Sequence, residues 1–282
     1  MNNSFSVFPM TQKISLKAGE TYHGYINVAI PAAATEDFAF KVELHPYSVS
    51  GKDYDVDLDT KSERSKIVDW IKIEDTEGIL APNGRQKINF TITVPENAPA
   101  GGQYAMIGVS SDNSAKEGDV VQNVYEMTSI IFAEIDGEIH HGGEILENYI
   151  PGFVTSGAPV VKTTVTNTGN VHETAYSAIK VKNAITGQEI ITPRQDDMHE
   201  SIIMPESTRE LVRTLADLPA LGVFEVTQDI SYLDHTLNNT TVMVVCPIWF
   251  IMLVLATILS VVLMIIYGKH LKRKKREKVM QE

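Results

Sequence analysis

Four aspartates alternate with other residues over one short stretch, at Asp53, Asp55, Asp57 and Asp59. Alternating carboxylates are the first ligands of a helix-loop-helix calcium site, which also needs a glycine at its sixth position and a glutamate at its twelfth. The chain has leucine and arginine at those two positions. The pattern therefore favours the solvent face of a strand or hairpin, with an irregular calcium site as the alternative.

Adjacent histidines occur once in the chain, at His140 and His141. Neighbouring residues on a strand point to opposite faces, so one metal ion cannot readily bind both rings, and we expect an exposed linker here. Cys246 is the single cysteine, which excludes an intrachain disulfide and, by its position, cysteine catalysis. No hydrolase elbow, zinc motif, phosphate loop or dinucleotide fingerprint is present. We predict no catalytic residue, no metal and no cofactor.

Aromatic residues offer a different kind of chemistry, because their rigid faces can stack on sugar rings. Tyr47 and Tyr54 lie in or beside a long polar stretch from residue 48 to residue 66, and Tyr104 follows a glycine-rich segment. Binding residues concentrate in loops held by rigid strands. We therefore predict Tyr47, Tyr54 and Tyr104 as binding residues, and we expect Trp70 to belong to the core.

The elements that position these residues have a period of two and are separated by turn residues, which is typical of half-buried strands. No sustained helical period appears before residue 242. The pattern predicts an all-β ectodomain of two tandem immunoglobulin-like antiparallel β-sandwiches, residues 1–136 and residues 143–241. The strands expected in the first sandwich are 12–16, 21–30, 38–44, 67–73, 88–94, 103–110 and 121–135. Those expected in the second are 144–154, 159–166, 174–183, 187–191, 207–213 and 222–232.

The two halves share a faint pattern, in which Pro99-Ala100-Gly101-Gly102-Gln103-Tyr104 corresponds to Pro219-Ala220-Leu221-Gly222-Val223-Phe224. Duplication explains this similarity, and so do similar turns at the ends of strands.

Residues 242–267 are predicted to form a transmembrane helix followed by a basic cytoplasmic tail, residues 268–282. From Ile248 to Tyr267 the only polar side chains are Thr257 and Ser260. Twenty helical residues span about 30 Å, the thickness of the hydrocarbon core. Aromatic and basic residues at its ends serve as the predicted membrane anchor: Trp249, Tyr267, Lys269, Lys272, Arg273, Lys274, Lys275 and Arg276.

Charge sets the predicted orientation of this single span. The tail from residue 269 holds seven basic and two acidic residues, whereas the rest of the chain has 17 basic and 34 acidic residues. Basic flanks stay on the cytoplasmic side, which places the acidic ectodomain outside the cell. An acidic balance also argues against nucleic acid as a partner. Residues 1–6 show no export signal, so we expect it to have been cleaved or omitted.

Three segments and the chain's opening resemble the first domain of the WxL protein-interacting proteins of Gram-positive bacteria. These are Asp69-Trp70-Ile71, Leu80-Ala81-Pro82-Asn83-Gly84, the stretch Ile92-Thr93-Val94-Pro95-Glu96-Asn97-Ala98-Pro99-Ala100-Gly101-Gly102-Gln103-Tyr104, and Phe5-Ser6-Val7-Phe8-Pro9. The order of two sandwiches, one span and a basic tail is also similar. The resemblance implies that the first domain binds peptidoglycan and that the second binds host or partner proteins.

These observations predict a membrane-anchored cell-surface protein that attaches to peptidoglycan and to WxL-type surface proteins or host ligands. The alternative is a structural stalk or assembly factor that presents partners without binding glycan, and an exported enzyme comes third. The ligand and the oligomeric state stay open at this stage.

Overall fold

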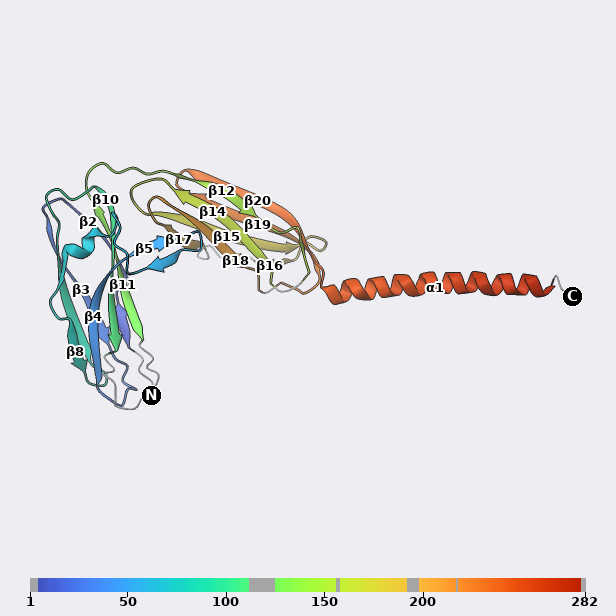
Figure 1. Cartoon of the computed structure of the whole chain (residues 1–282), viewed down its shortest axis with the longest axis horizontal. Coiled ribbons are helices and arrows are strands. Elements are labelled where there is room, and N and C mark those ends of the chain that lie inside the picture. Colours follow the sequence, from blue (N-terminus) through green and yellow to red (C-terminus); the bar gives the residue numbers. More distant parts are fainter. Residues whose placement is uncertain (1–4, 112–124, 156–157, 192–197, 217, 280–282) are drawn as a thin grey trace. The chain divides into compact units, whose positions relative to one another are not determined.

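The structure is a computed structural model of the chain and describes residues 5–111, 125–155, 158–191, 198–216 and 218–279. The chain divides into two compact units. Unit 1 contains Met1–Leu146, Thr164–Ala175 and Ser201–Glu210, and unit 2 contains Glu147–Thr163, Tyr176–Glu200 and Leu211–Glu282. Within the described residues the fold is all-β apart from a one-turn 3-10 helix and one long helix near the C-terminus, as the sequence predicts (Figure 1).

The strands up to residue 135 build the first sandwich. Its two sheets have the orders β1-β3-β9-β7 and β2-β11-β10-β4-β8. The strands are β1 (Ser6–Phe8), β2 (Thr11–Leu16), β3 (Thr21–Ala29), β4 (Phe38–Pro46), β7 (Ile71–Ile73), β8 (Glu77–Leu80), β9 (Arg85–Thr93), β10 (Gly101–Ser111) and β11 (Glu126–Ile135). Alternate residues of both sheets, such as Ile26, Ile88, Ile107 and Ile131, are fully buried in one core. Trp70 packs against this core, as the sequence predicts.

At one edge of this sandwich two strands pair in parallel, so the predicted purely antiparallel sandwich is incomplete. β1 pairs with β3 in one sheet, whereas β2, which follows after only two residues, runs parallel to β11 in the other sheet. The pairing of β2 is parallel because β11, its neighbour in the second sheet, runs in the same direction as β2. Three or four residues are too few to show a period, which is why the sequence did not predict β1 or β8.

The predicted polar loop from residue 48 to residue 66 contains a hairpin, in agreement with the alternating aspartates. β5 (Ser48–Ser50) and β6 (Asp55–Asp57) form an antiparallel hairpin, closed by Gly51 and Tyr54 with positive φ angles. The 3-10 helix η1 (Lys66–Asp69) then replaces the start of the strand expected from residue 67. Its turn is fixed because Ile67 is fully buried and donates its backbone N–H to Oε1 of Gln103, at 3.2 Å.

The strands from residue 143 to residue 245 form the second sandwich. One sheet has the order β12-β14-β18, and the other has the order β13-β20-β19-β15-β16, with β17 paired to β15. The strands are β12 (Gly143–Tyr149), β13 (Phe153–Val154), β14 (Val160–Asn167), β15 (Glu173–Asn183), β16 (Glu189–Ile191), β17 (His199–Ile203), β18 (Ser207–Thr214), β19 (Gly222–Tyr232) and β20 (His235–Val245). Within unit 2, Val161, Phe224 and Met243 are fully buried in a core that includes residues from both sheets. The parallel pairing of β13 with β20 repeats the change of sheets seen at the edge of the first sandwich.

The predicted start of the long helix is wrong by several residues. Val242–Val245 continue β20 and pair with residues 222–225 of β19, because this β-branched run has one buried face. The helix α1 (Ile248–Val279) begins after Pro247, whose carbonyl accepts hydrogen bonds from the N–H groups of Phe250 and Ile251. It continues through most of the predicted tail. By length and composition, Ile248–Lys272 could cross a membrane, and its most apolar window is not buried by any described residue.

Candidate binding surfaces

The three tyrosines predicted as binding residues come together in unit 1. Tyr47 and Tyr54 are partly buried against a small cluster that contains Tyr104 and Phe132. The ring centroids of Tyr47 and Phe132 are 6.1 Å apart, and those of Tyr104 and Phe132 are 5.6 Å apart, both edge to face. The structure thus joins the three positions, but as a packed cluster rather than as three rings exposed on loops.

The hydroxyl of Tyr54 makes two hydrogen-bond contacts inside unit 1. The hydroxyl lies 2.6 Å from Oγ of Ser207 and accepts a hydrogen bond of 2.6 Å from the N–H of Met204. The guanidinium of Arg209 lies 4.5 Å from the ring centroid and donates to the carbonyl of Ile202. Partial burial raises the pKa of Tyr54, and the Ser207 bond opposes that rise. The ring and the hydroxyl of Tyr54 therefore make these contacts within unit 1.

Tyr104 is fully buried, so its ring offers no face to a sugar, contrary to the glycan contact predicted from the sequence. The ring is buried because it lies against Gly102, which has no side chain. A Cβ atom at this position would lie 1.9 Å from the hydroxyl oxygen of Tyr104. The hydroxyl lies 3.4 Å from Nδ1 of His172. Burial raises the pKa of Tyr104, and burial, followed by the charge of Lys13, lowers the pKa of His172 to about 4. His172 is therefore neutral near pH 7.

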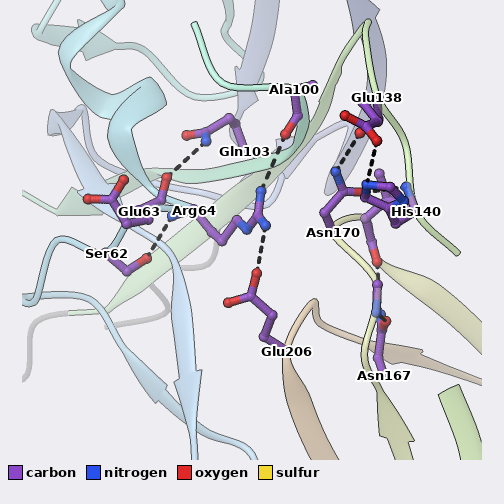
Figure 2. A network of polar contacts seen from close by, with 12 residues as sticks. Ser62, Glu63, Arg64, Ala100, Gln103, Glu138, His140, Asn167, Asn170 and Glu206 are labelled. Atoms are coloured by element: carbon purple, nitrogen blue, oxygen red, sulfur yellow. Dashed lines mark hydrogen bonds and ion pairs between the residues drawn. The ribbon is translucent and has the colours of Figure 1, made fainter. Parts of the chain in front are cut away.

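A polar network lies beside this cluster in unit 1. Figure 2 shows Arg64 between the carbonyl of Ala100 and the carboxylate of Glu206; its Nη2 donates to Oε1 of Glu206 at 2.6 Å. The buried amide of Gln103 donates to the carbonyl of Glu63.

The turn between β14 and β15 is fixed by a second part of the same network (Figure 2). Oδ1 of Asn170 accepts from the N–H of His140 at 2.7 Å, and its Nδ2 donates to the carbonyl of Glu138 at 2.8 Å. The carbonyl of Asn170 accepts from the N–H of Gly102, also at 2.7 Å. These groups use their hydrogen-bonding capacity within the unit, so we assign them a structural role.

The aspartates lie on and around the β5–β6 hairpin, as the alternation predicts. Oδ1 of Asp57 accepts from the backbone N–H groups of Asp59 and Thr60, and these bonds lower the pKa of Asp57. Among the residues that the structure describes, no three His, Cys, Asp or Glu side chains come together as a possible metal site. His140 and His141 are both exposed and face separate carboxylates, Glu138 and Glu173.

The sheet that contains β3, β9 and β7 has an exposed polar face that was not predicted from the sequence. Residues that face each other across an antiparallel pair lie on the same side of the sheet. Tyr25 is opposite Asn89, and His23 and Lys72 are both opposite Thr91. We call this surface the Tyr25 face. It consists of His23, Tyr25, Lys72, Lys87, Asn89 and Thr91.

The Tyr25 face has the composition of a ligand platform. The Tyr25 ring is 46% exposed, and Nζ of Lys87 lies 4.2 Å from the ring centroid. His23 contacts the hydroxyl of Thr91 at 3.2 Å, and Nδ2 of Asn89 donates to Glu74 at 3.0 Å. The alternation in residues 21–30 already placed Tyr25 opposite the core-facing residues. The lysine beside it comes from pairing with a strand about sixty residues away.

The predicted anchor residues lie on α1. Trp249 and Tyr267 are 61% and 64% exposed, and Lys269 and Lys272 follow on the same helix. The predicted anchor residues Arg273, Lys274, Lys275 and Arg276 lie in the last turns, where the structure describes the backbone only.

Beside the start of α1, unit 2 has an open pocket of about 490 Å³. Its walls include Leu218, Pro219, Val245, Ile248 and Trp249.

No protein-family model matches this chain, and neither does the sequence of any curated protein. Several solved structures have a similar fold. A chain of the CsuC–CsuE chaperone–tip adhesion subunit pre-assembly complex from Acinetobacter baumannii Csu pili is 12% identical, with 85% of this chain and 98% of that chain covered and a TM-score of 0.43. The E. coli chaperone DraB is 12% identical, with 85% and 96% covered and a TM-score of 0.39. These likenesses concern the fold alone.

Proposed function

We propose that this chain is a membrane-anchored cell-surface binding protein rather than an enzyme. The observation that carries the proposal is α1, a long apolar helix on an otherwise all-β chain, with nothing among the described residues to bury its apolar window. In water such a surface would be strongly unfavourable, whereas a bilayer removes it from water. The basic residues after Tyr267 support a topology with the C-terminus in the cytoplasm and both sandwiches outside.

An external protease tests this topology in intact cells whose wall has been removed. The sandwiches should be digested, while a tag placed after residue 282 stays protected. Protected sandwiches with a digestible tag would show the opposite orientation. Digestion of both the sandwiches and the tag in intact cells would contradict a membrane-spanning helix.

We infer that the ligand of the first sandwich is peptidoglycan and that the Tyr25 face binds it. The resemblance to WxL protein-interacting proteins supports a glycan ligand, and the face has an exposed aromatic ring for stacking. Peptidoglycan also carries carboxylates on its stem peptides. Lys72 and Lys87 are exposed on this face of an otherwise acidic protein, so they complement that charge.

Sedimentation with purified cell-wall sacculi tests the glycan proposal on the full chain in detergent micelles. The wild-type chain should sediment, Tyr25→Ala should lower the bound fraction several-fold, and Tyr125→Ala is the matched control, since Tyr125 is an exposed tyrosine of the same unit outside this face. Equal losses in both variants, or no loss in Tyr25→Ala, would exclude the Tyr25 face.

A structural stalk or assembly factor is the second candidate. The burial of Tyr104 and the internal contacts of Tyr54 favour it, because they remove two of the three aromatic rings expected to bind a ligand. In that case the chain presents WxL-type surface proteins or other partners without holding the wall. Absence of wild-type sedimentation with sacculi, together with retained membrane topology, would decide for this candidate.

A further inference from the structure

The second sandwich is tied to the start of α1 by a very short connection. β20 ends at Val245 and α1 begins at Ile248, so only Cys246 and Pro247 lie between them. A residue spans at most about 3.6 Å, which limits the distance from Val245 to Ile248 to about 11 Å. The N–H of Cys246 also donates to the carbonyl of Val154 at 2.8 Å, so the strand end is fixed up to that residue. If α1 enters a bilayer, this end of the sandwich lies at the bilayer surface.

The outward side of the sheet at this same end is apolar. Val223 and Phe153 are both register partners of Val244, on either side of it, so the three side chains form one row across β19, β20 and β13. Their neighbours Phe224 and Val245 face the core, which places the row on the outer side.

One further exposed residue extends this row, and a second lies in the turn that adjoins it. Val242 is the next outward residue along β20 and is 54% exposed. Ile185, which is 81% exposed, follows Ala184, whose N–H donates to the carbonyl of Val223 at 2.9 Å. We call these five residues the basal patch. The basal patch consists of Phe153, Ile185, Val223, Val242 and Val244.

The outward residues of β20 become apolar as the strand approaches the anchor. They are Thr236, Asn238 and Thr240, which are polar and exposed, and then Val242 and Val244. The nearest charge in the row, Glu225 opposite Val242, is neutralised by Lys182 at 2.7 Å. Single exposed apolar residues are ordinary on protein surfaces, but a contiguous group that ends at a membrane anchor is not.

We propose that the basal patch lies in the interfacial layer of the bilayer that α1 crosses, so that the second sandwich rests on lipid with this sheet face. The inference depends on the proposed membrane span. Lipid is the occupant that the structure favours, because the short connection brings the patch to the bilayer surface and the polarity of β20 changes in that direction. Apolar side chains gain free energy at the boundary between headgroups and acyl chains.

Spin labels on the full chain in nanodiscs of phosphatidylcholine and phosphatidylglycerol test the proposal. In a Cys246→Ser background, single cysteines would replace Phe153, Val242, Thr236 or Ser260, and accessibility to oxygen and to a water-soluble nickel chelate would be measured. The ratio of oxygen to nickel accessibility should be several-fold higher at Val242 and Phe153 than at Thr236, which lies on the same side of β20 at its far end. Ser260, in the middle of α1, should give the highest ratio.

The outcomes separate this inference from the proposed span. A high ratio at Ser260 with equal ratios at Val242 and Thr236 would overturn the lipid contact and leave the span intact. A water-like Ser260 would overturn both. Loss of both oxygen and nickel accessibility at Val242 would identify a protein contact in place of lipid. As a second variant, Val242→Glu should return a label at Phe153 towards the ratio of Thr236, since a carboxylate disfavours the interface and the exposed site tolerates it.

Discussion

A glycine near the start of one central strand of eleven residues, β10 in the first sandwich and β19 in the second, has a similar role in both sandwiches but a different setting. Gly102 precedes Tyr104 in β10, and Gly222 precedes Phe224 in β19, each by two residues. In both, the missing side chain makes room for the ring: a Cβ atom would meet Tyr104 at 1.9 Å and Phe224 at 2.6 Å. The ring of Tyr104 in the first sandwich carries a hydroxyl beside His172, whereas the ring of Phe224 in the second is packed in an apolar core.

The turn before the ring differs as well. Gly101 has a φ angle of +105°, and a Cβ atom there would lie 2.5 Å from the carbonyl oxygen of Asn170. The corresponding residue of the second sandwich is Leu221, which is 43% exposed. Its neighbours Pro219 and Ala220 line the open pocket beside Ile248. The same strand-end turn is therefore packed against a second turn in one sandwich and open in the other.

Removing the two rings should have the largest effect and should be equal in the two sandwiches. Tyr104→Ala and Phe224→Ala each delete a fully buried ring, so each should lower the free energy of unfolding by about 3–5 kcal/mol. Trp70 fluorescence in denaturant reports on the first sandwich, and amide exchange in β19 reports on the second. A loss below about 1 kcal/mol for either variant would show that the two positions are not equivalent.

Much of this comparison could be predicted from the sequence, because strands of nine to eleven residues show their period of two. Short strands such as β1, β5 and β6 could not, since three residues define no period. The sequence places Val242–Val245 in the helix because this segment and α1 are both apolar, and only Cys246 and Pro247 separate them. The burial of Tyr104 could not be predicted from the sequence, because the space that Gly102 leaves for the ring depends on how the strand packs. The Tyr25 face requires the register of β3 and β9, which no local pattern gives.

Substitutions in the two turns should lower the free energy of unfolding by different amounts. The substitution places a Cβ atom against a backbone carbonyl and forces an unfavourable φ angle, so it should lower the free energy of unfolding by about 3 kcal/mol. Leu221→Ala removes a partly exposed side chain and should cost less than about 1 kcal/mol. Gly51→Ala is the control, with a positive φ angle but no atom within 4 Å, and should cost about 1 kcal/mol. Similar losses for Gly101→Ala and Gly51→Ala would mean that the contact with Asn170 adds nothing.

Acid should destabilise the first sandwich through His172. The pKa of this ring is lowered to about 4 by burial, with a smaller contribution from Lys13, against an ordinary value near 6.5. As the pH falls from 6.5 to 4, the unfolded chain takes up a proton that the folded chain does not, so stability decreases across this window and levels off below it. The loss should be about 2 kcal/mol, reduced from the full shift because the ring is partly exposed.

A matched variant identifies the group responsible. In His172→Gln the acid-dependent loss between pH 6.5 and pH 4, followed by Trp70 fluorescence in denaturant, should largely disappear. Amide exchange in β19, corrected for the intrinsic pH dependence of exchange, should change less than in β10. An unchanged pH profile in His172→Gln would assign the loss to other groups.

The smallest effect is expected from making the first ring like the second. Tyr104→Phe keeps the ring and its packing and removes only the hydroxyl, which lies 3.4 Å from Nδ1 of His172, a long hydrogen bond. The free energy of unfolding should therefore decrease by only about 0.5–1 kcal/mol. A double-mutant cycle with His172→Gln measures the pair directly, and its coupling should be no larger than that loss. A coupling above about 2 kcal/mol would mean that the hydroxyl, and not the ring, holds the turn that contains His172. The two rings would then be held by different interactions, a hydroxyl contact at Tyr104 and apolar packing at Phe224, and the two positions would share only the glycine.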